Sequence, residues 1–477
     1  MTSLSAAIRE TSLLDATCED FVYDLVELVP TVGTQIGLDG HDGELQDYSP
    51  AFWDAVADRI RDLVQDVEAL NDSTDACDDE DDFDDVDRLT AAILRDQMTF
   101  ELDLHHRGEY LRRLNIIDSP VQTIRDSFAL MPKVTPEDFD NIASRMSKVR
   151  TALRGYAESL AEAAQTGDVA SHRQIDGVIS QCEALADDGS LLERQGLPPE
   201  SAVVEEAKQA FSEFADWLST ELSPQATHED GVGRDRYEMF SEFFLGRSID
   251  LDEAYNWAKD ELAKTVDEQV QLAHKLYGSD TNVLGAYRQL NEDPRYQVHG
   301  TDALMEWMRS VNDEVRSELN GKDLTVPEDL PPVECAIDGA GSGGIFYTPP
   351  SDDLLRPGTM WWSVPEGQEV FHTWQELTTV FHEGMPGHHL QIATTLLQRR
   401  DLNLWRRSLY WNSGHGEGWA LYAEHLMADH GYFDDPGYRM GLLDSRRLRL
   451  ARVLVDVGVH LKKATPDGIG TWDAQYA

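Results

Sequence analysis

Apolar residues recur at spacings of three and four along much of the first 330 residues, which is the period of an amphipathic helix. The segments with the clearest period are 21–28, 52–63, 142–160, 202–222 and 251–277. Helix starts are marked by Ser49-Pro50, by Thr135-Pro136 and by 248–253, where capping residues, Pro or acids stand at the first turn. No fixed-period repeat is present. The pattern therefore predicts a mainly α fold.

The pattern changes in the Gly- and Pro-rich segment 338–366. Two β-like pieces, 344–348 and 359–364, predict a hairpin there. Such a hairpin either serves the fold alone or offers an edge strand to an extended peptide. Helical periods return in 373–398, 416–430 and 440–463. We expect a single domain over 1–477, in which the hairpin segment separates helical regions at 1–330 and 373–477.

The chain is strongly acidic, with 89 Asp and Glu against 40 Lys and Arg and a formal net charge of -49. Such a charge repels nucleic acid and anionic membranes, so we expect neither as a partner. The acids are spread along the whole chain, which favours a halophilic protein, because concentrated salt screens their mutual repulsion. The alternative is an acidic protein that binds cations or basic partners.

One low-complexity run, 75–87, is almost wholly acidic. We interpret it as a solvated loop or helix start. Calcium binding is the alternative, although the Gly and the terminal Glu of an EF-hand loop are missing. No stretch of about 18 apolar residues is present, and the first residues lack the basic and apolar regions of a signal peptide. We therefore expect a cytoplasmic protein.

Candidate metal chemistry lies in the segment H-E-G-M-P-G-H-H-L-Q at 382–391. A His followed by Glu on an apolar helix, with more His downstream, is typical of metallopeptidases. In the usual H-E-x-x-H form the two His lie one turn apart on one face, and the Glu acts as general base. Here the position four after His382 is Pro386, so the usual form is broken.

On a straight helix His388 lies about 240° around the axis from His382, and His389 lies two turns along. Pro386 removes a helical hydrogen bond, and Gly387 tolerates unusual backbone angles. A break is therefore expected, and it can swing His388 back toward His382. The alternative is a kinked core helix with chance histidines.

A downstream segment, G-E-G-W-A-L-Y-A-E, adds two carboxylates. Glu417 and Glu424 lie two turns apart on one face of a predicted helix. Glu417 suits a third metal ligand, and Glu424 suits a partner for a ligating His. The alternative for Glu417 is a structural Arg–Glu pair.

Arg452, Asp456 and His460 are spaced four apart in an apolar segment, so on a helix they share a face. The functional interpretation is a His that stabilises an oxyanion and an Arg that grips a substrate carboxylate. The alternative is a buried polar network. The alternation V-D-V-G-V-H also fits a strand, so the helix is not the sole interpretation.

Three ordered motifs carry a resemblance: HEGMPGHHLQ at 382–391, EGWALYAE at 417–424 and VDVGVH at 455–460. Together with YTPPS at 347–351 and the region 29–37, they make the chain resemble the domain of unknown function 885 family over nearly its whole length. That family resembles the helical zinc peptidases that include angiotensin-converting enzyme and the oligopeptidases. The resemblance implies two helical lobes around a deep cleft, with the hairpin beside the metal.

By resemblance, His382, His388 and Glu417 would bind one Zn²⁺, with His388 preferred over His389, and Glu383 would be the base for hydrolysis of short peptides. Tyr347 and His460 are candidates for the donor that stabilises the oxyanion. In the family a further segment with P-G-Q and a Tyr follows the third motif, whereas only 17 residues follow His460 here. That departure motivates a second hypothesis, a non-catalytic peptide- or metal-binding protein. A zinc hydrolase of another amide or ester is the third.

Overall fold

The computed structural model describes residues 9–76, 83–198, 200–338, 344–465 and 470–473. It is mainly α, as predicted, with 65% helix, 16 helices and two small sheets over that part of the chain. The chain forms two compact units: Met1–His228 with Ser351–Asp353 and Gln398–Tyr410, and Glu229–Pro350 with Leu354–Leu397 and Trp411–Ala477. Within the described ranges, no helix has the length and apolar character to cross a membrane.

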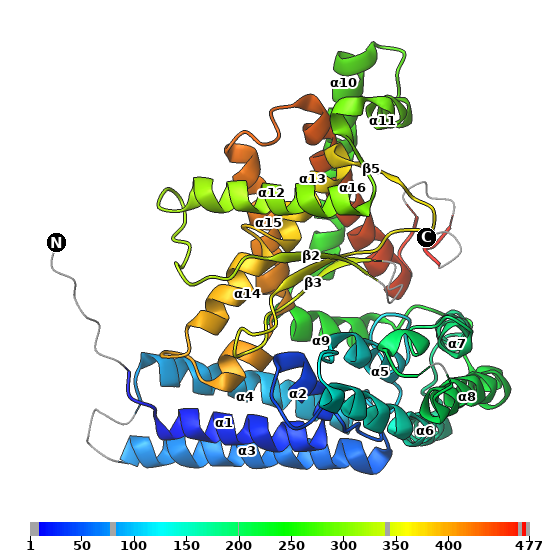
Figure 1. Ribbon diagram of the computed structural model, residues 1–477, viewed down its shortest axis with the longest axis vertical. Helices are drawn as coiled ribbons and strands as arrows, with labels where there is room; N and C mark the ends of the chain where they lie inside the picture. The colour runs from blue at the N-terminus through cyan, green and yellow to red at the C-terminus, as the bar shows by residue number, and fades with distance from the viewer. Residues whose placement is uncertain (1–8, 77–82, 199, 339–343, 466–469, 474–477) are drawn as a thin grey trace. The chain divides into compact units, whose positions relative to one another are not determined.

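Helices are the regular elements of the described part of the first unit (Figure 1). Its helices are α1 (Leu13–Leu28), α2 (Pro30–Ile36), α3 (Pro50–Ala76), α4 (Asp85–His106), α5 (Pro120–Leu130), α6 (Pro136–Gln165), α7 (His172–Ala186) and α8 (Ala202–Trp217). Two apolar cores hold them, one around Phe21 and Leu94, the other around Phe128 and Phe211. The predicted start at Thr135 is confirmed, since its side chain caps α6 by accepting from the Asp138 N–H.

Residues 77–82 of the acidic run lie outside the described residues. Residues 75 and 76 end α3, whereas the part after the gap begins a helix, because Asp84 caps α4 by accepting a hydrogen bond from the Asp87 N–H at 2.8 Å. The helix-start interpretation therefore holds for residues 84–87.

The second unit contains eight helices and five strands among its described residues. The helices are α9 (Arg234–Leu245), α10 (Leu251–Tyr277), α11 (Val283–Glu292), α12 (Thr301–Leu319), α13 (Thr373–Glu383), α14 (His388–Leu397), α15 (Ser413–Asp429) and α16 (Pro436–His460). The strands are β1 (Gln297–His299), β2 (Glu334–Ile337), β3 (Ile345–Thr348), β4 (Thr359–Trp362) and β5 (Val370–His372).

The predicted hairpin is confirmed, because β3 pairs antiparallel with β4 and Tyr347 lies opposite Met360. Residues 339–343 of the Gly- and Pro-rich segment lie outside the described residues. Strand β2 joins the other edge of β4 in parallel, so β3 forms the far edge of the three-stranded sheet. Helix α12 covers this sheet, with Leu304 and Met308 packed in one core with Met360 and Trp362 (Figure 1). The small β1–β5 ladder was not predicted.

Helix α13 packs against both α15 and α16, and these three helices carry His382, Glu383, Glu417, Glu424 and the polar residues of α16. Phe381 and Leu390 from the two sides of the helix break share an apolar core with Met427 of α15. Helix α16 approaches α13 closely at Gly441, where a Cβ would overlap the carbonyl oxygen of Trp374. Because α16 is one continuous helix to His460, the strand alternative for its last residues is wrong.

Candidate metal centre

The helix carrying His382 breaks where the sequence predicts it. Helix α13 ends at Glu383 and α14 begins at His388, with a cis Met385–Pro386 peptide bond between them. A side chain at Gly387 would overlap the carbonyl oxygens of His382 and Phe381, so the close chain crossing there requires glycine. The break replaces the straight path on which His388 would point away from His382.

Two side chains from other helices hold this break. The side-chain oxygen of Asn312 on α12 accepts a hydrogen bond from the Met385 N–H at 2.7 Å. The indole N–H of Trp419 on α15 donates to the carbonyl oxygen of Pro386 at 2.9 Å. Both satisfy backbone groups that the interrupted helix leaves unpaired. The path between the two histidines is therefore fixed by tertiary contacts.

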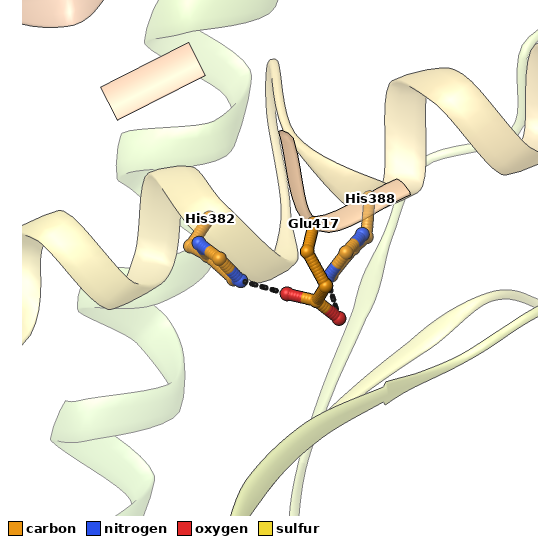
Figure 2. A group of neighbouring side chains, drawn as sticks. All are labelled: His382, His388 and Glu417. Atoms are coloured by element: carbon orange, nitrogen blue, oxygen red, sulfur yellow. Dashed lines mark hydrogen bonds and ion pairs between the residues drawn. The ribbon is translucent and has the colours of Figure 1, made fainter. Parts of the chain in front are cut away.

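The break brings His382 and His388 together with Glu417 (Figure 2). Nε2 of His382 lies 3.3 Å from one oxygen of Glu417, and Nε2 of His388 lies 3.7 Å from the other. One ligand atom from each of the three residues falls within 4.8 Å of the others. His389 points elsewhere, so the geometry selects His388 from the adjacent pair.

This donor set fits a tetrahedral metal ion. Ligand atoms about 2.1 Å from a tetrahedral centre lie roughly 3.4 Å from one another, close to the two nitrogen–oxygen distances observed. Two imidazoles and one carboxylate are a set that zinc enzymes use, with the fourth position left for water or substrate. Glu417 is the exposed member, with its side chain 55% accessible, so the group of three is open to solvent on the side of this carboxylate.

The other nitrogen of His382 is held by a buried ion pair. Nδ1 lies 2.8 Å from Glu424, whose side chain is only 3% exposed. Arg449 of α16 contacts both oxygens of this carboxylate, at 2.9 and 2.7 Å, and the Thr378 hydroxyl donates to it. A carboxylate behind a ligating imidazole fixes its tautomer and raises its basicity. His388 differs, because its buried Nδ1 has no hydrogen-bond partner among the residues described.

The charges of the site follow from these contacts. Burial alone would lower the pKa of His382, but the hydrogen bonds to Glu417 and Glu424 raise it to about 9. Burial and the charge of His382 lower the pKa of His388 to about 4. The hydrogen bond from His382 lowers the pKa of Glu417. For Glu424, burial raises the pKa, and the bonds from His382 and Arg449 outweigh it and lower the value.

Glu383 stands beside this group without a partner. It is only 8% exposed and lines the same cavity, and no described side chain forms a hydrogen bond or ion pair with it. Burial raises its pKa to about 7. An unpaired buried carboxylate is costly, and its persistence next to three potential ligands is the pattern expected of a general base.

Tyr347 reaches the cavity from β3 and contacts His389. Nε2 of His389 lies 2.9 Å from the carbonyl oxygen of Pro331, which can only accept, so this nitrogen carries the proton. Nδ1 then accepts from the Tyr347 hydroxyl at 2.9 Å. Burial lowers the pKa of His389 to about 4, which keeps the ring neutral. His389 therefore holds Tyr347 at the cavity wall.

The three polar residues predicted to share one face of α16, Arg452, Asp456 and His460, do not all reach the cavity. Arg452 and Asp456 line the cavity, whereas His460 is not among the lining residues. His460 instead lies against the Tyr237 ring, and its Nδ1 accepts from the Val232 N–H at 3.2 Å. Residues four apart drift by about 40° around a helix, so a stripe from Arg452 to His460 turns away by about 80°. His460 still lies 3.6 Å from the Asp456 carboxylate, so neighbours along the stripe stay together, although His460 itself is outside the cavity lining.

The cavity has a volume of about 1400 Å³ and is lined wholly by residues of the second unit. Beside the candidate ligands its walls are largely apolar, formed by β3, α14, α15 and α16. The apolar members are Ile345, Phe346, Pro349, Ile392, Trp411, Leu421, Leu448, Ala451, Val453 and Val455. A cavity of this character with a few convergent polar groups is typical of a ligand site.

Arg449, Thr378 and Asn312 are site residues that sequence reasoning missed. Arg449 stands three residues before Arg452, so extending the polar stripe backward along α16 would have found it. Thr378 lies one helical turn before His382, a weaker signal. Asn312 had no signal, because it comes from a helix 70 residues upstream of His382.

Fold and geometry together define a mainly helical protein with a candidate metal centre. Residues 30–476 match the family described as "Bacterial protein of unknown function (DUF885)", and the chain belongs to this family. The family resemblance of the three sequence motifs is thereby confirmed. The family description names no activity.

Solved structures share the fold at low sequence identity. A crystal structure described as a "putative lipoprotein" from Colwellia psychrerythraea is similar over 95% of this chain and 84% of that chain, with a TM-score of 0.73 and 19% identity. A "putative lipoprotein of unknown function" from Shewanella oneidensis is similar over 96% and 85%, with a TM-score of 0.64 and 16% identity. No curated protein matches the sequence.

Proposed function

We propose that the protein is a zinc-dependent hydrolase of short peptides. One observation carries the proposal: His382, His388 and Glu417 converge at a cavity that the unpaired carboxylate of Glu383 also lines. Three ligands, an open position and a neighbouring base are the parts that metal-assisted hydrolysis needs. A kinked structural helix with chance histidines needs neither the buried carboxylate behind His382 nor the unpaired Glu383.

The chain's own residues have distinct tasks in this proposal. His382, His388 and Glu417 would hold the ion, which supplies Lewis-acid polarisation of the scissile carbonyl and favours ionisation of water. Glu383 accepts a proton as the water oxygen bonds to the carbonyl carbon, and it returns that proton to the amine nitrogen as the C–N bond breaks. Arg449 and Glu424 keep His382 oriented throughout.

The cavity supports a peptide as substrate. Its apolar walls suit apolar side chains, and β3 borders it as the edge strand of its sheet. An edge strand offers unpaired backbone groups to an extended chain. The strongly acidic composition supports neither nucleic acid nor an anionic membrane as partner.

The proposal keeps the cytoplasmic location expected from the sequence. The two similar crystal structures are described as lipoproteins, but at 19% and 16% identity that description does not transfer to this chain. Cell fractionation with an antibody against the native protein tests the location, and recovery in the membrane fraction would contradict it.

The first test is metal content, measured by elemental analysis of protein purified without chelator in molar salt. We expect about one zinc per chain in the wild type and loss of zinc in Glu417→Ala. Asp429→Ala, which removes an exposed carboxylate from the same helix, is the matched control and should keep the metal. Folded wild-type protein that takes up no transition metal when zinc is offered would remove the proposal.

The second test is hydrolysis of a broad library of short peptides. We expect cleavage by zinc-loaded wild type and none by Glu383→Gln, which should keep its zinc. Zinc-containing protein that binds peptides without cutting them would instead indicate a binding protein. Cleavage restricted to other amides or to esters would indicate the third hypothesis.

A further inference from the structure

The cavity wall formed by α16 carries three charged groups in a row. Arg449, Arg452 and Asp456 stand at positions i, i+3 and i+7, so they share one helix face, and all three line the cavity. Arg449 is engaged by Glu424, and Asp456 accepts a hydrogen bond from the Tyr237 hydroxyl. Arg452 is exposed and forms no hydrogen bond or ion pair with any residue in the described part of the chain.

An unpaired Arg is informative in so acidic a protein, where acids outnumber bases 89 to 40. The other arginines of α16 have partners: Arg439 pairs with Glu268 and Arg446 with Glu261, whereas Arg447 donates to the Gln269 amide oxygen. Asp456, one turn beyond Arg452, makes no ion pair with it. The N–H donors of the Arg452 guanidinium are therefore available in the cavity to bind a planar oxyanion such as a carboxylate.

The position of Arg452 limits where such a carboxylate would sit. Arg449 lies 3.4 Å from Nδ1 of His382, on the side of the ring away from Glu417. Arg452 follows three residues later, about 4.5 Å farther along the helix axis. Arg452 lines the same cavity as the three candidate ligands, so a substrate carboxylate held there belongs to a chain whose nearby bonds can reach the metal position. A substrate carboxylate that extended past Arg452 would be repelled by the carboxylate of Asp456.

We propose that Arg452 binds the free C-terminal carboxylate of the substrate, so that the protein cuts short peptides near their C-terminal end. This inference rests on the proposed function for the cleavage step, but the binding preference stands by itself. Arg452 is then a specificity residue, which touches the end of the substrate and not the scissile bond.

Three acetylated peptides of one length test the inference: acetyl-Ala-Phe-Leu with a free carboxylate, its C-terminal amide, and acetyl-Ala-Phe-Glu amide. Binding is measured by calorimetry on full-length, zinc-loaded Glu383→Gln protein in molar KCl, where turnover does not interfere. We expect the free acid to bind at least about tenfold more tightly than either amide, because a bidentate charged contact is lost on amidation.

Adding Arg452→Gln to the Glu383→Gln protein should bring the affinities for the three peptides to within about twofold of one another, because the charge and the paired N–H donors are both removed. Arg452→Lys keeps the charge without the paired N–H donors and should restore part of the preference. Arg446→Gln is the matched control, since it removes a positive charge from the same helix outside the cavity, and it should keep the full preference.

Three results would overturn the inference outright, and a fourth would reassign Arg452. They are equal binding of acid and amide, a preference that survives Arg452→Gln, and binding of none of the peptides. Equal binding of the Glu-containing amide and the free acid would assign Arg452 to acidic side chains instead, which also rejects a C-terminal role. Hydrolysis by the protein with Glu383 intact is scored separately: a carboxylate preference without cleavage rejects the proposed function and keeps Arg452 as an anchor.

Discussion

Glu424 lies 2.8 Å from Nδ1 of His382, on the opposite side of the imidazole from Glu417. The buried carboxylate makes Nδ1 the donor and leaves Nε2 as the nitrogen that faces the candidate metal position. Glu424 is itself fixed by Arg449 at 2.7 Å, so three helices, α13, α15 and α16, determine the orientation of one ring.

The Glu424→Gln substitution tests this relationship. The amide keeps the shape but removes the charge that raises the basicity of His382 and pairs with Arg449. We expect zinc affinity to fall about 10- to 100-fold, the usual effect of losing such a partner. Competition with a chromophoric chelator measures the dissociation constant. Glu268→Gln removes the partner of Arg439 elsewhere on α16 and should leave the affinity unchanged; an equal loss in both variants would show that the effect is not specific to the site.

Two glycine substitutions near the site should have opposite effects. Gly387→Ala places a Cβ against the carbonyl oxygens of His382 and Phe381, which belong to the backbone and cannot yield. We expect it to destabilise the fold by about 2 kcal/mol or more and to weaken zinc binding. Gly418→Ala on α15 meets open space, so it should stabilise the helix by up to about 1 kcal/mol.

Thermal unfolding in molar salt, with and without zinc, measures the stability and the zinc binding of both glycine variants. Because Gly418 adjoins the candidate ligand Glu417, a normal zinc affinity in Gly418→Ala controls for disturbance of the ligand helix. Stability equal to wild type in Gly387→Ala would contradict the tight crossing at the break.

Much of the helical framework can be predicted from the sequence because its signals are local. Thr135 and Asp250 mark helix starts through side chains that cap the next turn, and both cap as expected. Pro386 and Gly387 mark the break in the same way, since each acts on its own backbone. The β1 and β2 strands, of three and four residues, are too short for a period, and their partners lie far along the chain.

The site is predictable only where ligands are adjacent in sequence or follow a helical period. The direction in which the chain leaves Gly387 depends on Asn312 and Trp419, so His388 could not be selected over His389 from backbone chemistry alone. The family pattern, and not the spacing, favoured His388. Along α16 a spacing of four keeps Asp456 and His460 in contact, but the drift of about 40° at each step leaves His460 outside the cavity that Arg452 lines.

The buried carboxyl group of Glu376 should make the free energy of unfolding depend on pH. Burial raises its pKa to about 7, and it has no hydrogen-bond or ion-pair partner in the described structure. Because the folded pKa exceeds the unfolded value, the folded state holds the proton more tightly, and stability is lost as pH rises from about 4.5 to 7. Glu376→Gln mimics the protonated acid, so it should raise the free energy of unfolding by about 1–2 kcal/mol at pH 8, and the gain should shrink toward pH 5.

Denaturant unfolding at the two pH values measures this difference for Glu376→Gln. Glu366→Gln, at an exposed carboxylate, corrects for the loss of one negative charge from a chain of net charge -49. A gain at pH 8 that is no larger than at pH 5 would show that Glu376 is ionised without penalty in the folded protein.

Tyr347 either donates a hydrogen bond to the substrate during the reaction or only forms part of the cavity wall. Its hydroxyl donates to Nδ1 of His389, which is held neutral and fixed by Pro331, so the proton is committed away from the metal ligands. To stabilise an oxyanion the hydroxyl must exchange that bond for one to the substrate. A donor that does so contributes about 10²- to 10³-fold to turnover, whereas a wall residue contributes to folding alone.

On any peptide that zinc-loaded protein cleaves, Tyr347→Phe should therefore lower kcat by that factor while zinc content stays at the wild-type level. Tyr422→Phe, at an exposed tyrosine of α15, is the control and should leave kcat unchanged. A normal kcat combined with a lower Tm in Tyr347→Phe would assign the Tyr347–His389 bond to stability and leave the oxyanion to another donor.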